Sequence, residues 1–537
     1  MAEERLAARA EEGGVRSSGP ALRPGPPGSD RRLRFLARVA AHLTRVAADA
    51  TGTHLAVRAR PGPPPDRIVV AFPWRNRTAA ETFAKELARL LIEVVPSRRS
   101  IRAAVRRLAA TVVAAEPGPQ PTVPEPAIPV IAVTGTNGKT TTVRLLAHLA
   151  RTAGMTVAYS STDGVYVQDR LVESGDYSGF GGAGKAMSQP GADVAVLETA
   201  RGGILLRGVG TAHNDVAVVT NISNDHLGMH GIETLDQLAE VKSTILRITK
   251  PDGWDVLNAD DPRVLAMRRV AHGRPWLFSL DPNHPALRSA LNEGGRGMTV
   301  LDGVITVLER GREPHPLVAL DRVPVTLAGL SSNNVQNALG AAAAALGVGL
   351  AERAVVKGLR SFVLDPETNP GRANLFELDG RVIVVDYAHN EAGMAGLVEV
   401  ARGLCRPNGE VWLTYSSAGD RSDEILHGVG YLAARGADHV AIAQLEHYLR
   451  GREPLELIEH LRAGAVDGGK EPDDVPDFPD EVRALEWMLE QAGPRDVTAL
   501  TALGQRPEVF ELLRGLGATR VGPTRVRQLV RRARRSA

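Results

Sequence analysis

VTGTNGKTTTVRLL, residues 133–146, is the stretch that decides the fold. It follows the apolar run PVIAV and leads into an amphipathic run, so it predicts a strand, a glycine-rich loop and a helix. The commonest phosphate-binding loop, G-x-x-x-x-G-K-[ST], requires glycine where this chain has Val133. Gly135 gives a shorter loop, G-T-N-G-K-T, whose glycines still allow backbone N–H groups to approach a polyphosphate. A βα turn without a ligand is the weaker alternative.

Outward from this loop, buried strands alternate with helical patterns. Apolar runs that end in polar residues occur at 155–162, 193–200 and 215–223 and predict a mostly parallel sheet that is covered on both faces. Similar runs begin at 381, 410, 439 and 496 and predict a second, smaller α/β domain of Rossmann-like type. Ligands of such sheets gather beyond the carboxyl ends of the strands.

The rest of the chain suggests a modular organisation. Helical patterns at 32–50 and 79–95 enclose strand-like runs at 54–60 and 67–74, which predict a small N-terminal α/β domain. The predicted divisions are a disordered segment 1–30, this domain at 31–115, a proline-rich linker at 116–129, a central domain at 130–370 and a C-terminal domain with a basic tail at 371–537.

Composition limits the class of protein. With 43% hydrophobic and 23% charged residues, the chain is typical of globular domains. Its only cysteine is Cys405, which rules out an intrachain disulfide framework. A net charge of +2 gives no case for nucleic-acid binding, and no apolar run is long enough to span a membrane. We therefore expect a cytoplasmic protein, in which the basic tail is a solvated helix.

Three further positions carry groups that a fold alone does not require. Glu198 ends an apolar run, His226 follows the next such run after Asp225, and Lys242 lies on a helical stretch. Each alone has an ordinary explanation, such as a helix cap or a solvated face. Together with Lys139 for phosphates and the Thr140 hydroxyl for Mg²⁺, they indicate a nucleotide site with a divalent metal.

Seven motifs give a more specific resemblance. GTNGKTT, LETARGGI, NISNDHLG, the Lys242 helix, NNVQNAL, NPGR and DYAHN occur in an order and spacing similar to those of the Mur ligase family. Within that family, STDGVYV, NPGRANLFEL and AGDRSDE most resemble the Mur-type portion of cyanophycin synthetases. Those enzymes also carry an ATP-grasp domain. Only about 126 residues precede the similar region here, so we expect no backbone extension by this chain alone.

The resemblance implies roles for individual residues. It implies ATP and Mg²⁺ as cofactors, catalytic roles for Lys139, Glu198, His226 and Lys242, and metal binding by Thr140, Glu198, His226 and a carbamylated Lys242. The residues implied for nucleotide binding are Gly135, Thr136, Asn137, Gly138, Lys139, Thr140, Thr141, Asn334, Asn337, Arg372, Asp386 and His389.

The implied reaction is amide formation between a carboxylate acceptor and an amino acid, through an acyl phosphate. Two alternatives stay open. One is a folylpolyglutamate or poly-γ-glutamate type of ligase, and the other is a nucleotide-binding regulatory subunit that no longer ligates. A homo-oligomer and a partner ATP-grasp enzyme are both compatible with the sequence.

Overall fold

The computed structural model describes residues 26, 29–55, 57–61, 67–94, 101–118, 123–225, 227, 231–445 and 448–534. Nearly all of the segment predicted to be disordered, 1–30, lies outside these residues, and so does His226. The chain divides into two compact units. One comprises residues 1–123 with 205–208, and the other comprises 124–204 and 209–537.

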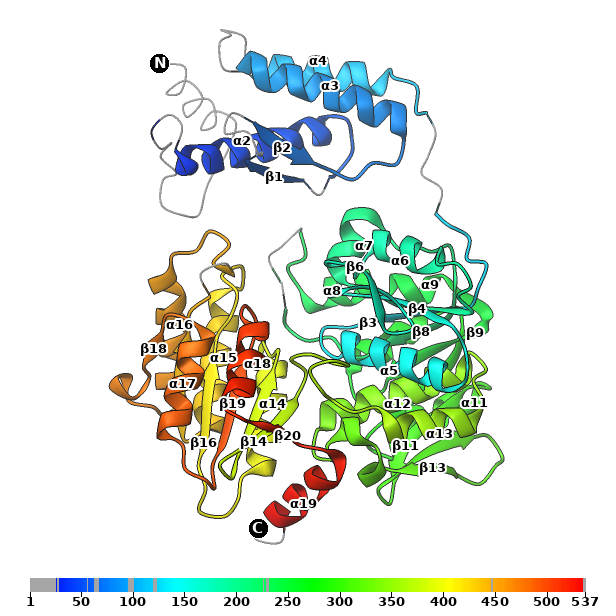
Figure 1. Cartoon of the computed structure of the whole chain (residues 1–537). Coiled ribbons are helices and arrows are strands. Elements are labelled where there is room, and N and C mark those ends of the chain that lie inside the picture. Colours follow the sequence, from blue (N-terminus) through cyan, green and yellow to red (C-terminus); the bar gives the residue numbers. More distant parts are fainter. Residues whose placement is uncertain are drawn as a thin grey trace. The chain divides into compact units, whose positions relative to one another are not determined.

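Among its described residues, the first unit has three helices and one hairpin, which Figure 1 labels. Its elements are α2 (Asp30–Ala50), β1 (Arg58–Pro61), β2 (Ile68–Ala71), α3 (Arg77–Val94) and α4 (Ile101–Val113). The strands pair antiparallel, and a small core forms around Phe35, Phe83 and Leu108. The sequence patterns predicted α2, α3 and both strands but not α4, whose four buried residues, two of them alanine, are interrupted by arginines.

The second unit begins with an eleven-stranded sheet in the order β13-β12-β11-β10-β9-β8-β3-β7-β4-β5-β6. Pairing is parallel from β11 to β4 and antiparallel at both ends of the sheet. The strands are β3 (Val130–Thr134), β4 (Val157–Ser161), β5 (Gly164–Val167), β6 (Arg170–Ser174), β7 (Val194–Glu198), β8 (Asn214–Val219), β9 (Thr249–Asn258), β10 (Arg274–Ser279), β11 (Arg296–Leu301), β12 (Val304–Glu309) and β13 (His315–Ala319).

Helices cover this sheet because its central strands are apolar on both faces. Their bounds are α5 (Lys139–Thr152), α6 (Phe180–Met187), α7 (Arg201–Arg207), α8 (Leu235–Lys242), α9 (Thr244–Arg247), α10 (Pro262–Ala266), α11 (Pro285–Asn292), α12 (Ser332–Gly347) and α13 (Glu352–Ser361). Helices α5, α12 and α13 pack together, while α6 packs on β4 and β7 around a separate small core.

A seven-stranded sheet follows, in the order β18-β17-β16-β19-β15-β14-β20. Its strands are β14 (Asn374–Leu378), β15 (Arg381–Asp386), β16 (Val411–Tyr415), β17 (His439–Ala443), β18 (Asp477–Phe478), β19 (Val497–Thr501) and β20 (Thr519–Arg520). Its helices are α14 (Glu391–Leu404), α15 (Asp423–Gly436), α16 (Pro454–Asp467), α17 (Glu481–Gln491), α18 (Arg506–Gly515) and α19 (Pro523–Arg534). The predicted fold class, two mostly parallel α/β sheets after a small α/β unit, is confirmed; the domain boundaries stay predictions.

The basic tail is more than a solvated helix. On α19, Val526, Leu529 and Val530 are buried and belong to the main core. The arginines occupy the other faces of the helix, where Arg525 pairs with Glu377 at 2.6 Å. Because arginine dominates this segment, its amphipathic character was not predicted from the sequence. The helix packs against α14.

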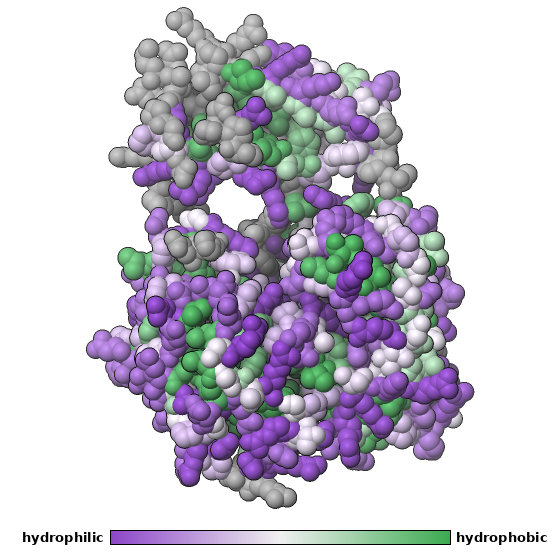
Figure 2. Space-filling view, viewed as in Figure 1, coloured by the Kyte–Doolittle hydropathy of each residue, from purple (hydrophilic) through white to green (hydrophobic). Residues whose placement is uncertain are grey.

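On the face drawn in Figure 2, the described surface of the second unit is mainly hydrophilic with several apolar areas. Leu171 and Val172 on the edge strand β6 are among its exposed apolar side chains. Within the part of the chain that the structure describes, no helix has the length and apolar character needed to cross a membrane.

Candidate active site at the glycine-rich loop

The glycine-rich loop joins β3 to α5, as the sequence predicts. Gly135 has φ 148° and Gly138, the N-cap of α5, has φ 85°. A Cβ at Gly135 would lie 1.9 Å from Thr220 Oγ1, and one at Gly138 would lie 2.2 Å from Asn337 Oδ1. Both glycines are therefore required by backbone conformation and by crowding. The resulting turn leaves the N-terminus of α5 at the carboxyl edge of the sheet, the position that favours an anion.

Three neighbouring parallel strands, β8, β3 and β7, deliver the polar groups to this edge. Glu198 is the last residue of β7 and is 2% exposed. The Thr140 hydroxyl donates to Glu198 at 3.2 Å to Oε1 and 3.0 Å to Oε2. The Thr162 hydroxyl donates a hydrogen bond to Glu198 Oε1 at 2.9 Å. A buried carboxylate beside a loop hydroxyl is an oxygen donor set suited to a hard divalent cation, so these residues fit Mg²⁺.

The two lysines of the site have different surroundings. The Lys139 ammonium donates to Thr136 O at 2.9 Å. Lys242, at the end of α8, is buried and donates to Gly135 O at 2.5 Å. Burial, and secondarily the charge of Lys139, lowers the pKa of Lys242 well below its ordinary value, although Asp225 opposes this shift. A lowered pKa increases the share of the neutral amine, which is the form that can add CO₂.

The two asparagines implied for the adenine side lie at the start of α12, against the loop. Asn337 Nδ2 donates to Asn334 Oδ1 at 3.0 Å. Asn337 Oδ1 accepts from the Thr142 hydroxyl at 3.4 Å, one turn into α5. The structure therefore brings α12 into direct contact with the loop helix.

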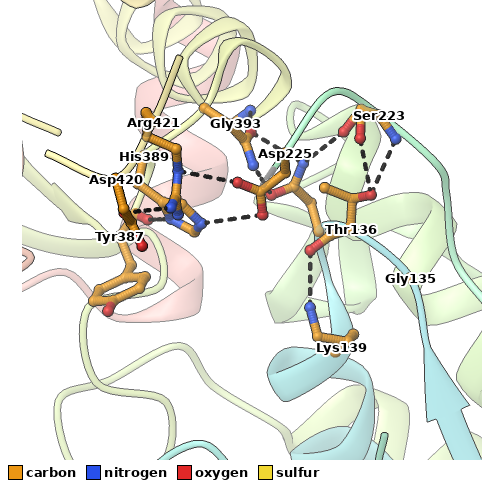
Figure 3. Close-up of polar contacts among 12 residues, drawn as sticks. Gly135, Thr136, Lys139, Ser223, Asp225, Tyr387, His389, Gly393, Asp420 and Arg421 are labelled. Carbon is orange, nitrogen blue, oxygen red and sulfur yellow. Dashed lines mark hydrogen bonds and ion pairs between the residues drawn. The ribbon is translucent and has the colours of Figure 1, made fainter. Parts of the chain in front are cut away.

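Residues of the second sheet also reach the loop (Figure 3). Asn137 and Asn390 exchange side-chain amide hydrogen bonds at 3.2 Å. Asp225 forms an ion pair with Arg421 at 3.1 Å and lies 3.9 Å from His389 Nε2. His389 Nδ1 lies 2.8 Å from the carbonyl oxygen of Tyr387, and a carbonyl only accepts. Nδ1 therefore carries a proton, and Nε2 faces Asp225.

Arg372 and Asp386 lie beside Tyr387, near the segment that connects the two sheets. The Arg372 guanidinium stands 4.2 Å from the centre of the Tyr387 ring. Asp386 accepts from the backbone of Ala373 at 2.7 Å. Burial raises the pKa of Asp386, and Arg372 opposes that shift. Arg372 and Asp386 therefore lie at the connection between the two sheets, and not at the carboxyl end of β7, which carries Glu198.

Four residues of this site were not among the site residues predicted from the sequence. Thr162 contacts Glu198, and Asn390 contacts Asn137 of the loop. The other two are Asp225 and Arg421, which form an ion pair with each other. Each lies inside a motif that had been singled out, NISNDHLG, STDGVYV, DYAHN or AGDRSDE. The available signal was a polar residue in the short segment that follows a buried strand.

Family models match most of the second unit. One described as "Mur ligase middle domain" matches residues 133–345, and one described as "Mur ligase, glutamate ligase domain" matches 371–504. A cyanophycin synthetase of Synechocystis sp. is 39% identical over 339 residues, which are 63% of this chain and 38% of that protein. The chain spans between 36% and 41% of the length of the curated cyanophycin synthetases it matches.

Other relatives are matched over more of their length. A UDP-N-acetylmuramoyl-L-alanyl-D-glutamate–2,6-diaminopimelate ligase of Alkalilimnicola ehrlichii is 30% identical over 70% of this chain and 71% of that protein. A Yersinia pestis folylpolyglutamate synthase/dihydrofolate synthase structure with AMPPNP and Mn has TM-score 0.53 at 20% identity, covering 73% of this chain and 90% of that one. The latter likeness establishes the fold. With both family domains present in order, the chain belongs to the Mur ligase family.

Proposed function

We propose that this chain is an ATP-dependent acid–amino-acid ligase of the cyanophycin synthetase type, acting through an acyl phosphate. The observation that carries the proposal is the convergence of Lys139, Thr140, Glu198 and Lys242 on one glycine-rich loop at the carboxyl ends of β3, β7 and β8. A nucleotide-binding fold alone does not need a buried lysine beside a buried carboxylate.

In this proposal the loop binds the nucleotide. Backbone N–H groups between Gly135 and Thr140 hold the phosphate oxygens, and Lys139 neutralises the outer charge after leaving Thr136 O. Thr140 and Glu198 would hold Mg²⁺, and His226 with carbamylated Lys242 would hold a second divalent ion. Such ions neutralise charge on the phosphates and on the acceptor carboxylate when bound.

The chemistry then proceeds in two steps. An oxygen of the acceptor carboxylate attacks the γ-phosphorus, and the bond to the β–γ bridging oxygen breaks, releasing ADP and leaving an acyl phosphate. The nitrogen of the incoming amine attacks the acyl carbon, the C–O bond to phosphate breaks, and the amine proton passes to phosphate or water. The residues act by positioning and by charge neutralisation, and no side-chain nucleophile is required.

The second sheet completes the site in this proposal. Asn390 holds Asn137 of the loop, while Arg421 and His389 face Asp225. Arg372, Asp386 and His389 are proposed to approach the ribose and phosphates, with Asn334 and Asn337 on the adenine side. This arrangement makes both sheets part of one ATP site.

The test is phosphate release from ATP with Mg²⁺, screening single amino acids against β-aspartyl, polyaspartate and glutamyl acceptors. Release that requires an amine and an aspartyl acceptor together is the expected result. Release that requires glutamyl acceptors would move the assignment to the folylpolyglutamate or poly-γ-glutamate type. Tight ATP binding with no release for any pair would indicate the regulatory subunit and overturn the proposal.

A further inference from the structure

The segment that connects the two sheets, residues 368–374, is held by side chains from both sides. Arg144 on α5 donates through Nη1 to Thr368 O at 2.8 Å. Arg506, the first residue of α18, donates through Nη1 to Pro370 O at 3.1 Å. One arginine therefore anchors the segment to the loop helix, and the other anchors it to the second sheet.

A single carboxylate links these two arginines. Asp163 Oδ2 accepts from Arg144 Nη2 at 2.8 Å, and Asp163 Oδ1 accepts from Arg506 Nη2 at 3.0 Å. The Arg144 side chain is 5% exposed. Burial tends to raise the pKa of Asp163, but Arg506 and Arg144 outweigh it and hold that pKa below its usual value. The carboxylate is therefore ionised at neutral pH and separates two guanidinium groups.

The turn that carries Asp163 also touches the candidate metal site. Its neighbour Thr162 donates to Glu198 through both its hydroxyl, at 2.9 Å, and its backbone N–H, at 3.3 Å. On the other side, buried Asn369 of the connecting segment donates to the Thr141 hydroxyl of the loop at 3.2 Å. One short turn between β4 and β5 thus contacts the proposed metal ligand Glu198 directly and, through Arg144 and Arg506, reaches the connection between the sheets.

We propose that Asp163 is a positioning residue, whose carboxylate clamps the connecting segment between α5 and α18 and so holds Arg372 and Asp386 in place for the nucleotide. Its part in ATP use rests on the proposed function. The clamp itself does not, because it is a property of the connecting segment. Loss of the carboxylate leaves Arg144 and Arg506 as like charges that face each other, one of them buried, and they separate.

The test compares Asp163→Asn with Asp169→Asn in the full chain. Asp169 follows β5 and forms an ion pair with Arg151 of α5, so it offers an aspartate–arginine pair on the same helix and hairpin without contact to residues 368–374. Hydrogen exchange of peptides that cover 368–374 is measured by mass spectrometry, with and without a non-hydrolysable ATP analogue. KM for ATP and kcat are measured alongside.

In Asp163→Asn, the amide hydrogens of residues 368–374 should exchange at least about tenfold faster than in wild type. In Asp169→Asn, they should exchange at the wild-type rate. KM for ATP should rise about tenfold in Asp163→Asn with a smaller change in kcat, and Asp163→Glu should recover part of the loss. A global loss of structure would instead raise exchange across both sheets. Unchanged exchange at 368–374 in Asp163→Asn would overturn the proposal.

A second variant keeps the test decisive if Asp163→Asn does not fold. Arg506→Lys retains a positive charge for Asp163 but cannot reach Asp163 and Pro370 O together, because it lacks the forked guanidinium. It should loosen 368–374 in the same way, and unchanged exchange there would overturn the proposal. Where Asp163→Asn does fold, the double variant should be no looser than either single one. Additive effects would show two independent contacts and would overturn the clamp. Exchange needs no turnover, so a chain without ligase activity would contradict only the proposed function.

Discussion

Glu198 illustrates how tightly individual side chains are fixed in this site. Its two oxygens accept from Thr140 and Thr162, which lie on different elements, while its own strand is fully buried. Such a carboxylate cannot turn away from the loop without depriving the buried Thr140 hydroxyl and the half-buried Thr162 hydroxyl of their acceptor. At the scale of single residues, the site is therefore organised in advance, and substitutions should affect chemistry more than folding.

Lys139→Ala should lower ATP turnover by at least about 100-fold, because it removes the cation that is proposed to neutralise the outer phosphates. Its ammonium bonds only to Thr136 O among the hydrogen bonds described, so the melting temperature should stay close to that of wild type. Steady-state phosphate release and a thermal melt check both points. Lys357→Ala, at an exposed position of α13, is the matched control and should keep full activity. Normal turnover in Lys139→Ala would remove the loop from the mechanism.

Lys242→Ala should lower kcat by about 100-fold, since it removes a proposed metal ligand. Formate or acetate should restore part of the activity, because a short carboxylate can occupy the space of a carbamate. Lys250→Ala, which removes a more exposed lysine paired with Asp215, should show neither the loss nor the rescue. In wild type, ¹³C NMR with labelled bicarbonate should show a carbamate resonance that is absent from Lys242→Ala.

At the scale of elements, β9 carries a buried carboxyl group, that of Asp255, in the core of the eleven-stranded sheet. Asp255 is fully buried, and it accepts from the Thr249 hydroxyl and the Gly273 backbone, each at 2.7 Å. Burial raises the pKa of Asp255 to about 7, although these hydrogen bonds oppose the shift. The folded strand therefore favours the protonated acid, whereas the unfolded chain ionises near its ordinary pKa.

Because the pKa of Asp255 is higher in the folded chain than in the unfolded chain, raising the pH destabilises the fold. The contribution of Asp255 to stability is largest below about pH 4 and is lost as pH rises to about 7, by roughly 4 kcal/mol at most. In Asp255→Asn, Thr249 can donate to Ile245 O and accept from the new amide, so the site stays satisfied. Denaturant unfolding should show the variant gaining stability relative to wild type between pH 4 and 7. A constant difference across that range would exclude ionisation of Asp255.

At the scale of the whole molecule, the two sheets of the second unit share the site through Asp225 and Arg421. Both side chains are at most 10% exposed, and they come from positions nearly 200 residues apart in the sequence. An ion pair of this kind is costly to break on one side only, because the remaining charge stays buried. It therefore links the geometry of β8 to that of β16.

Arg421→Gln should reduce kcat/KM by about 100-fold. Asp225 loses its ion-pair partner, and the seven-stranded sheet is no longer held in place against the glycine-rich loop. Arg402→Gln, which breaks an exposed pair with Asp438 in the same sheet, is the control and should change kcat/KM less than about twofold. Steady-state kinetics with saturating Mg²⁺ measure both. Equal effects of the two variants would show that the Asp225–Arg421 pair has no special role.

The sequence allowed the fold to be predicted where local patterns agree with the final packing. The loop after β3 and Glu198 at the end of β7 were predictable because the carboxyl ends of neighbouring parallel strands meet. The Asp163 contacts were not predictable, because they join residues 19 and 343 positions away in the sequence. The buried face of α19 was missed since its five arginines outnumber the three apolar residues that pack, and α4 was missed because arginines interrupt its short apolar pattern.

Cys405, the only thiol of the chain, ends α14 and is half-buried. Burial raises the pKa of its thiol above the ordinary value, and alkylating and oxidising reagents attack the thiolate. The native chain should therefore behave almost as a cysteine-free background toward maleimides at neutral pH. A cysteine introduced at an exposed position would react first, so fluorophores or spin labels can be attached one site at a time without removing Cys405.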